Sequence, residues 1–475
     1  MLFSSVVFVL YFLPIVLIMY YAFAFSRTLQ NILLLIASLI FYAWGEVKFA
    51  GLMCISIVVN TIFGYLVDKF RDNKRKSKFV VFLAVVYNLT VLFIFKYLMF
   101  AVTNINALFN TNFSVGKVIL PLGISFYTFQ AISYVVDVYR DDAKVEKNPI
   151  YVGLYIAFFP QLIAGPIVRY NSIAEQIKNR KSNFDKFSIG CCRFLVGFSK
   201  KILLSNNFAM VADKIFELTD SQVIPVSLAW LGAIAYTLQI YFDFSAYSDM
   251  AIGLAGMFGF RLEENFNYPY ISKSIGEFWR RWHISLSTFF KEYVYFPLGG
   301  SRVENQDKMV RNTFIVWLLT GVWHGAEWTF IVWGLCNFIF ILGERLFNFE
   351  KSKVPNSIKH IYTMFAVILG WVLFRAENLS KAFLYLKNMF GINSNGFASD
   401  TLLMYLKEYG VFFIAGIIFA TPIAKRINKM NVERKMPVIG NIITLLYPIV
   451  IIGLFLISMT YLVAGSYNPF IYFNF

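Results

Sequence analysis

The stretch Phe79-Val-Val-Phe-Leu-Ala-Val-Val-Tyr-Asn-Leu-Thr-Val-Leu-Phe-Ile-Phe-Lys-Tyr-Leu-Met-Phe-Ala101 decides the fold class of this chain. It holds one charged side chain, Lys96, and is as long as the roughly 20 residues with which an α-helix crosses a bilayer. We therefore predict an all-α polytopic membrane protein with about 11–13 helices and additional re-entrant segments. The other predicted spans are 4–25, 29–45, 49–66, 117–137, 149–168, 190–212, 222–242, 312–342 (as one or two helices), 358–374, 409–424 and 437–465.

The composition excludes the main classes of soluble protein. The 475 residues are 58% hydrophobic and 19% aromatic, only 15% are charged, and the mean hydropathy is +0.62. Because roughly a quarter of an ordinary globular chain is charged, water-soluble enzymes, disordered proteins and disulfide scaffolds are excluded. The four cysteines have neither metal-site spacing nor a paired framework, so we expect free thiols.

The net charge of +16 indicates topology, because the basic residues gather in short loops between apolar stretches. The loops Lys69–Lys78 and Lys425–Lys435 are predicted to be cytoplasmic, where they meet anionic lipid headgroups. Counting spans from these loops places both termini outside, in a bacterial cytoplasmic (inner) membrane. We expect the first apolar stretch to be retained as a span, and we expect no nucleic-acid partner.

Several apolar segments are interrupted. Pro160, Gly165 and Pro166 break the stretch 149–168, and irregular backbone at membrane depth occurs where protein or a water-filled cavity covers it. We therefore predict a re-entrant element there, and we extend this interpretation to 242–259. In the polar segment 261–311, by contrast, Phe278–Phe290 suits one amphipathic helix at the cytoplasmic interface.

His324 is the strongest candidate for chemistry, because it lies in an apolar segment without a basic flank. An ionisable residue inside a span is a functional candidate by default. The functional hypothesis is a general base, held neutral by burial, and the structural alternative is a neutral imidazole that bridges two helices. Gly321 and Gly325 would allow a ligand to approach the backbone, and Glu327 would orient the ring or cap a polar network.

The other titratable candidates have competing structural explanations. His283 is either functional or structural, and Arg280 and Arg281 either clamp a phosphate or anchor the segment to lipid. Asp243 and Asp249 bind a cation, orient a histidine or cap a broken helix. His360 is expected to be a solvated surface residue, and no nucleotide-binding or zinc motif occurs.

Four motifs carry a resemblance to a known family: Gln239-Ile-Tyr-Phe-Asp-Phe-Ser-Ala-Tyr-Ser-Asp-Met-Ala-Ile-Gly-Leu-Ala255, Phe278-Trp-Arg-Arg-Trp-His-Ile-Ser-Leu-Ser287, Tyr293-Val-Tyr-Phe-Pro-Leu-Gly-Gly300 and Trp323-His-Gly-Ala326. Together they resemble the membrane-bound O-acyltransferase family, and most of all its bacterial branch that acetylates alginate and peptidoglycan. The resemblance covers nearly the whole chain. It implies one transmembrane domain, 1–475, with a motif core at about 117–345, and a ring of helices around a thin central funnel.

The resemblance also assigns roles to residues. It makes His324 the catalytic histidine and His283 the second motif histidine. An acceptor hydroxyl deprotonated by His324 would attack the thioester of acetyl-CoA, the acyl donor, and no permanently bound cofactor is implied. Trp323 would form a wall of the tunnel. The residues expected to bind substrate are Trp323, Arg280, Arg281, Asp243 and Trp282, with the two arginines on the CoA phosphates.

The C-terminal stretch Asn468-Pro-Phe-Ile-Tyr-Phe-Asn-Phe475 resembles the aromatic tail motif of this branch. We hypothesise that Tyr472 accepts the acetyl group and presents it to a periplasmic or extracellular acetyltransferase partner. The alternative is an aromatic tail that only anchors at the membrane interface. One departure from the family pattern is Asn206, where relatives carry an aspartate, so an ionic role at this position is in doubt.

The leading functional hypothesis is a membrane O-acetyltransferase that moves acetyl groups across the membrane for O-acetylation of a cell-surface glycan. Peptidoglycan is the preferred acceptor, because the richness in Phe, Ile, Asn and Lys indicates an AT-rich bacterial genome. The alternatives are acetylation of alginate or another exopolysaccharide, D-alanylation of teichoic acid and, from a different class, a proton-coupled transporter.

Overall fold

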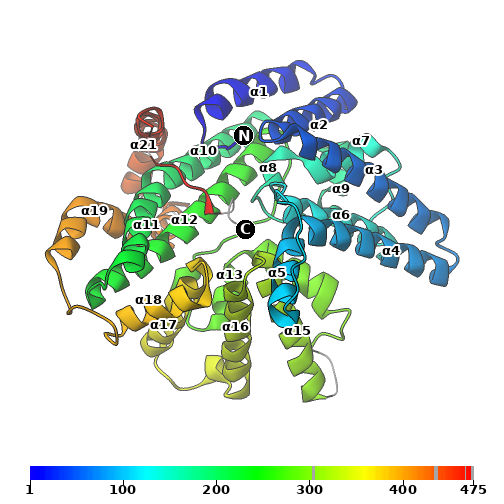
Figure 1. The fold of residues 1–475 in the computed structure, drawn as a ribbon. Coiled ribbons are helices and arrows are strands. Elements are labelled where there is room, and N and C mark those ends of the chain that lie inside the picture. The colour runs from blue at the N-terminus through cyan, green and yellow to red at the C-terminus, as the bar shows by residue number, and fades with distance from the viewer. Residues whose placement is uncertain (302–304, 433–436, 466, 472–475) are drawn as a thin grey trace. The chain divides into compact units, whose positions relative to one another are not determined.

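The computed structural model describes residues 1–301, 305–432, 437–465 and 467–471, and this part of the chain is helical without strands (Figure 1). Its contacts divide into two units, Met1–Phe194 with Ser248–Glu263, and Leu195–Tyr247 with Glu264–Phe475. We describe each unit by itself. The all-helical class predicted from the sequence is confirmed.

The first unit contains the N-terminal helices. Helices α3, α4 and α6 pack on one another, and α2 packs on α3 and α7. The elements are η1 (Phe8–Phe12), α1 (Leu13–Ala22), α2 (Arg27–Ala43), α3 (Val47–Lys69), α4 (Lys74–Leu92), η2 (Phe93–Tyr97), α5 (Leu98–Phe109), α6 (Ile124–Arg140), α7 (Pro149–Ala157), α8 (Phe159–Leu162), α9 (Tyr170–Asn179) and most of α10 (Phe184–Ser199).

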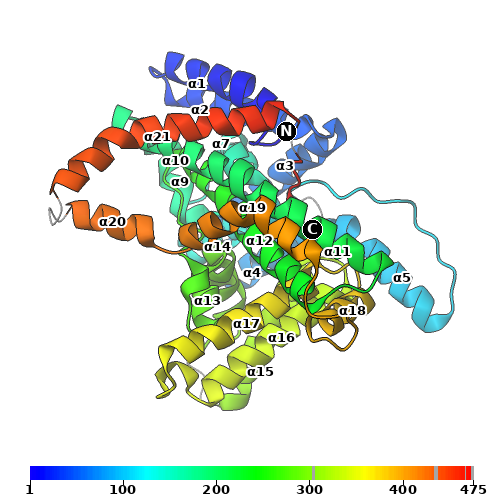
Figure 2. The ribbon, with the colours of Figure 1, turned by 90° about the vertical axis from the view of Figure 1, so that its left-hand side faces the viewer.

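The second unit contains both histidine motifs. In it, α16 packs on α15 and α17, and the three helices run side by side in Figure 2. The elements that follow α10 are η3 (Lys200–Ser205), α11 (Asn206–Ser221), α12 (Val226–Met257, which ends in the first unit), η4 (Pro269–Ile271), α13 (Ile275–Arg281), α14 (Ile284–Phe290), η5 (Lys291–Tyr295), α15 (Gln306–His324), α16 (Trp328–Leu346), η6 (Phe349–Lys351), α17 (Asn356–Arg375), α18 (Leu379–Met389), α19 (Asp400–Phe419), α20 (Ile423–Val432) and α21 (Pro437–Val463).

Membrane-spanning character is clear in six helical segments of the described residues, each long and apolar enough to cross a bilayer. They are Val47–Lys69, Lys74–Phe109, Trp328–Leu346, Asn356–Arg375, Asp400–Phe419 and Leu445–Val463. Two shorter apolar helical segments, Phe8–Ala22 and Arg27–Ala43, precede them. The protein is therefore a multi-pass membrane protein.

Helix breaks were predicted from glycine and proline in two segments. The structure has a break in 149–168 and none in 242–257. The stretch 149–168 is broken as predicted, since α7 ends at Ala157 and α8 is a single turn, and residues 152–168 are buried. The predicted break in 242–259 is wrong, because α12 continues to Met257. Its glycine spacing serves packing instead: a Cβ on Gly253 would lie 2.6 Å from the Gly190 carbonyl oxygen, so the two helices approach closely.

Candidate functional site

His324 is the last residue of α15 and lies where the chain turns into α16. Its side chain is buried, with 4% of the residue exposed. The imidazole packs among aromatic rings, with centroids 4.9 Å from Trp323, 5.1 Å from Trp333 and 5.1 Å from Phe374. The predicted burial of this histidine is confirmed, and an aromatic enclosure keeps water away from the imidazole.

The glycines beside His324 have a packing role that differs from the predicted one. We expected Gly321 and Gly325 to leave room for a ligand. A Cβ on Gly321 would instead meet the Phe330 carbonyl oxygen at 2.6 Å, and a Cβ on Gly325 would meet the Phe330 ring at 2.2 Å. The space is filled by α16, and the glycines allow the α15–α16 turn to close tightly.

His283 occupies a turn between two short helices, so the predicted single helix over Phe278–Phe290 is wrong. Helix α13 ends at Arg281, α14 begins at Ile284, and His283 between them has φ +44° in the left-handed region. A side chain with a Cβ rarely adopts this conformation, and such residues cluster at functional sites. The segment buries His283, which is 1% exposed, and Phe278, which is 0% exposed, whereas the Arg280 side chain is 61% exposed.

Asn265, which sequence analysis did not identify, holds this turn. Its Oδ1 accepts hydrogen bonds from the Ser285 backbone N–H (3.1 Å) and hydroxyl (2.9 Å), and its carbonyl accepts from the Ile284 N–H (3.0 Å). Because a backbone N–H only donates, the side-chain atom facing it is the amide oxygen. That oxygen lies 3.2 Å from Nδ1 of His283, so Nδ1 carries the proton in this contact.

Burial fixes the charge state of His283. Desolvation lowers the pKa of His283 to about 3, so the imidazole is neutral at physiological pH. With the proton on Nδ1, the lone pair lies on Nε2. Nε2 of His283 can therefore accept a hydrogen bond, and the tautomer of the ring is set by Asn265.

One tryptophan lies between the two histidines. The Trp323 ring centroid is 4.9 Å from that of His324 and 6.1 Å from that of His283. Trp282 lies in the adjoining aromatic cluster, where its ring centroid is 4.9 Å from that of Trp371. The structure therefore brings His283, Trp323 and His324 together and gives Trp282 a packing position.

The two arginines lie in the last turn of α13, directly before Trp282 and His283, and belong to a mixed charge cluster. Ser274 caps the helix by accepting from the Glu277 N–H, and the Glu277 carboxylate accepts from the Lys273 N–H. The Glu344 carboxylate accepts from the N–H groups of Ile275 (2.6 Å) and Gly276 (2.9 Å). These bonds satisfy backbone N–H groups in the first turn of α13 and fix the position of the helix that carries Arg280 and Arg281.

Each arginine has a carboxylate partner. Arg280 pairs with Glu350 at 2.6 Å, and Arg281 pairs with Glu277 at 2.9 Å. Partial burial alone would raise the pKa of Glu350, but hydrogen bonds from Arg280 and Ser274, with the charges of Arg280 and Lys359, lower it overall. A surface cavity of about 540 Å³ lies over this cluster, lined by Lys273, Ser274, Glu277, Arg280, Arg281, Glu350, Asn356 and Lys359.

Asp243 is part of a buried ion pair, and among the described residues no group of three potential ligands forms a metal site. Its Oδ1 lies 2.6 Å from Nζ of Lys201, and both side chains are at most 2% exposed. Asp249 is likewise paired, with Arg193 at 2.9 Å. Of the roles weighed for these aspartates, helix capping at a break is wrong, because α12 has no break there.

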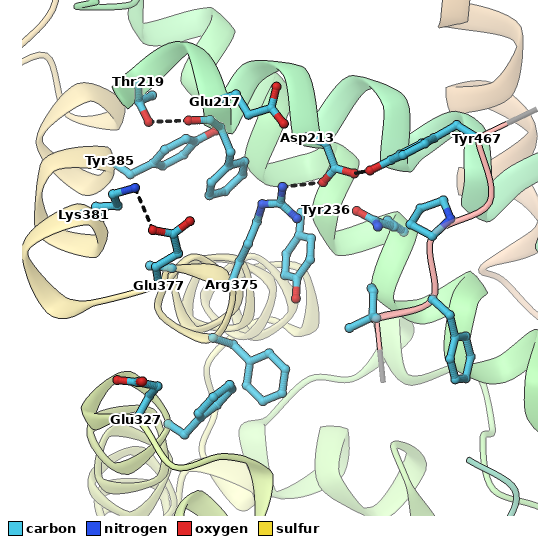
Figure 3. Close-up of a pocket in the computed structure, with 18 residues that line it drawn as sticks. Asp213, Glu217, Thr219, Tyr236, Glu327, Arg375, Glu377, Lys381, Tyr385 and Tyr467 are labelled. Carbon is cyan, nitrogen blue, oxygen red and sulfur yellow. Dashed lines mark hydrogen bonds and ion pairs between the residues drawn. The ribbon is translucent and has the colours of Figure 1, made fainter. Parts of the chain in front are cut away.

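A second cavity, also about 540 Å³, is shown in Figure 3. Phe374 lines it and packs against the imidazole. Gln239 lines it as well, and its buried Oε1 accepts no hydrogen bond from the described residues. The charged lining residues are Asp213, Glu217, Glu327, Arg375, Glu377 and Lys381, and the end of the described chain contributes Tyr467, Pro469, Phe470 and Ile471.

The remaining predictions concern Glu327, His360, Tyr472 and the cysteines. Glu327 is exposed at the start of α16 and lines this cavity, where partial burial raises its pKa. His360 is half-buried, with Nδ1 2.9 Å from the Ser272 carbonyl oxygen, so its assignment as a solvated residue is wrong. Tyr472 lies outside the described residues. All four cysteines are free thiols, as predicted.

Comparison with known proteins identifies relatives along the whole chain. The probable alginate O-acetylase AlgI of Azotobacter vinelandii is 40% identical over 505 aligned residues that cover 100% of both chains. The peptidoglycan O-acetyltransferase of Helicobacter pylori is 36% identical over 83% of this chain and 80% of that protein. The teichoic acid D-alanyltransferase of Bacillus subtilis is 31% identical over 49% of this chain and 60% of that protein.

The family profile gives the same result. The profile of the membrane-bound O-acyltransferase family matches residues 142–380, a range that contains both histidines and both arginines. The AlgI relative extends the likeness along the whole chain. The chain belongs to the membrane-bound O-acyltransferase family, and it is an O-acyltransferase.

Proposed function

We propose that this protein transfers acetyl groups from cytoplasmic acetyl-CoA to an acceptor on the outer side of the bacterial inner membrane, for O-acetylation of a cell-surface glycan. The observation that carries the proposal is the position of His324, buried among aromatic rings beside a cavity. Family membership supports enzymatic acyl transfer over the transporter hypothesis.

The donor would bind at the basic end of α13. CoA carries several phosphates, and guanidinium groups match phosphate oxygens in geometry. Four basic and two acidic side chains line the cavity there. Binding of a phosphate would require Arg280 to exchange Glu350 for the ligand, which is feasible because the Arg280 side chain is 61% exposed.

The acceptor would enter from the cavity beside Phe374. His324 takes the proton of the acceptor hydroxyl, the oxygen forms a bond to the thioester carbonyl carbon, and the carbon–sulfur bond breaks to release CoA thiolate. The imidazolium then gives its proton to the thiolate. Gln239 places an amide oxygen in the cavity wall that would accept a hydrogen bond from a hydroxyl of the acceptor.

Peptidoglycan is the proposed acceptor glycan, and alginate or another exopolysaccharide is the second candidate. The composition argument for an AT-rich genome supports peptidoglycan, and the H. pylori relative carries that name at 36% identity. Alginate or another exopolysaccharide is favoured by the 40% identity to AlgI over the whole chain. The teichoic acid alternative rests on a match to only half of the chain. Tyr472 remains the proposed carrier of the acetyl group to an external partner protein.

The direct test is release of CoA thiol from acetyl-CoA by the purified protein in lipid nanodiscs. We expect His324→Ala to lower the rate by about 10²–10⁴-fold, the usual contribution of a general base. His360→Ala is the matched control and should retain the native rate, since His360 contacts the Ser272 carbonyl away from the cavity. Equal release by the native protein and the His324 variant would contradict the role of His324.

Glycan specificity needs a separate experiment. Radiolabelled acetyl-CoA is supplied to cell envelopes that contain the protein and retain its external partner protein, together with isolated peptidoglycan or alginate. Alkali-labile label on peptidoglycan alone is the expected result, and label on alginate alone would replace peptidoglycan by the second candidate.

A further inference from the structure

The segment Tyr467–Ile471 begins at the surface with Tyr467, which is 49% exposed, and its far end is inserted into the second unit. Phe470 is 6% and Ile471 8% exposed, and the Phe470 ring centroid lies 5.2 Å from that of Tyr247 on α12. In Figure 3 this segment passes along one side of the cavity beside α11 and α12. An aromatic anchor alone would explain the contact of Phe470, but it would not explain the polar contacts of the neighbouring residues.

Those polar contacts centre on the buried pair of Lys201 and Asp243. Nζ of Lys201 donates to the Pro469 carbonyl oxygen, and Oδ2 of Asp243 accepts from the Ile471 N–H at 2.8 Å. The charged groups thus each make one bond to the other and one to the inserted segment. Ser205 adds a hydroxyl donor to Oδ1 of Asp243 at 3.4 Å.

Burial of the ion pair and docking of the segment stabilise each other. Removing two charges from water is costly, and the attraction between them offsets the cost only when additional hydrogen bonds satisfy both groups. Here the backbone of Pro469 and Ile471 supplies those bonds. The pair therefore holds the segment, and the segment stabilises the buried pair.

Two further contacts set the register of the segment. Tyr467 donates from its hydroxyl to Oδ2 of Asp213 at 2.9 Å, and Asp213 also pairs with Arg375 (Figure 3). Asn206 donates from Nδ2 to Oδ1 of Asn468 at 3.3 Å. A side-chain amide can donate this bond and a carboxylate cannot, so the asparagine at position 206 suits docking of the segment.

We propose that Lys201 and Asp243 are positioning residues that dock segment 467–471 inside the second unit and so complete the cavity wall next to His324. Four residues of the segment line that cavity, and Phe374 links the cavity to the imidazole. Any effect of docking on acetyl transfer rests on the proposed function, whereas the docking itself does not.

The test measures amide hydrogen exchange of residues 467–471 in nanodiscs. The double variant Lys201→Met with Asp243→Leu removes both charges together, so no unpaired charge is left buried and the fold is retained. We expect exchange of the Ile471 amide to become at least tenfold faster, because its acceptor is lost. The matched control, Arg193→Met with Asp249→Leu, removes a 2.9 Å ion pair of the first unit and should leave this exchange unchanged.

A second measurement keeps the proposal testable if the double variant is less stable than expected. Deleting residues 466–475 should lower the thermal midpoint of the native protein by more than it lowers that of the double variant, because the deletion exposes the ion pair only where the pair exists. Native exchange rates in a folded double variant, or equal effects of the deletion in both backgrounds, would overturn the proposal. CoA release is measured separately, so failure of the proposed function would not alter either result.

Discussion

The two ends of the α16–α17 pair differ in charge. Glu327 and Arg375 mark one end, where the cavity beside Phe374 is lined by four acidic and two basic side chains. Glu350 and Lys359 mark the other end, where the cavity is lined by four basic and two acidic side chains. Since both helices are candidate spans, the two cavities lie at opposite ends of the same spans.

This difference suits two ligands of different charge. A polyphosphorylated donor such as CoA is attracted to the basic end and repelled by the acid-rich end. A polyuronate such as alginate would also be disfavoured in the acid-rich cavity, whereas a neutral hydroxyl would not. Under the proposed function, this contrast is consistent with donor binding at the basic end and entry of an acceptor hydroxyl at the acid-rich end.

The largest expected effect is on stability, and it should differ between glycines near the two ends of α16. Gly325→Ala should destabilise the protein by about 3 kcal/mol, because the added Cβ would lie 2.2 Å from the Phe330 ring. Gly343→Ala is the control near the other end, since a Cβ there meets nothing within 4 Å. Thermal unfolding in detergent checks both variants, and equal midpoints would contradict the close packing of the α15–α16 turn.

The next effect concerns the buried imidazole between the two ends. The pKa of His283 is lowered to about 3 by burial, below its ordinary value of 6.5. The unfolded chain therefore binds the additional proton between these values, and stability falls as pH falls below 6.5. Between pH 7 and pH 5, the free energy of unfolding of the native protein should fall by about 2 kcal/mol more than that of a His283→Gln variant. Parallel stability curves for the two proteins would show that the imidazole is not held neutral.

A smaller effect tests the basic end. The double variant Arg280→Ala with Arg281→Ala should raise KM for acetyl-CoA about tenfold with little change in kcat, a loss of about 1.4 kcal/mol of binding. Arg375→Ala, at the acid-rich end, should leave this KM unchanged. Steady-state kinetics with acetyl-CoA as the varied substrate decide the matter, and a KM that rises only in the Arg375 variant would reverse the assignment of the two ends.

The smallest effect has the opposite sign. Glu350→Gln removes the carboxylate 2.6 Å from Arg280 and leaves that guanidinium available to a phosphate. KM for acetyl-CoA should fall about threefold, in keeping with the small energies of exposed ion pairs. An increase in KM would mean that Glu350 aids donor binding, for example by orienting Arg280.

The sequence predicted those parts of the site that depend on composition and motif. Apolar length indicated the all-helical membrane fold, and an isolated histidine in an apolar stretch identified His324 as buried. The tight turn at Gly325 was misinterpreted, because the partner ring of Phe330 comes from the next helix and its approach depends on tertiary packing. Likewise, the periodicity of Phe278–Phe290 fits one helix, but the contacts of Asn265 stabilise a turn at His283.

Long-range pairing was the least predictable part. Nothing near Lys201 in the sequence indicates that it pairs with Asp243, 42 positions away, or that Pro469 and Ile471 contact both. The available signal was that Lys201 and Asp243 are charged residues in apolar segments, so each needed a partner of opposite charge. That signal does not say which residue the partner is. Gln239 gave no such signal, since its role depends on the cavity that it lines.

The sidedness of the reaction in sealed proteoliposomes distinguishes donor binding at the basic end from donor binding at the acid-rich end. Maleimide labelling of Lys273→Cys, in a protein whose four native cysteines are replaced by serine, identifies the vesicle face on which the basic end is exposed. Acetyl-CoA is then supplied to one face at a time. The account predicts CoA thiol release that depends on His324 only when acetyl-CoA is on the face of residue 273. Release from the opposite face, where Glu377 and the acid-rich cavity lie, would contradict it.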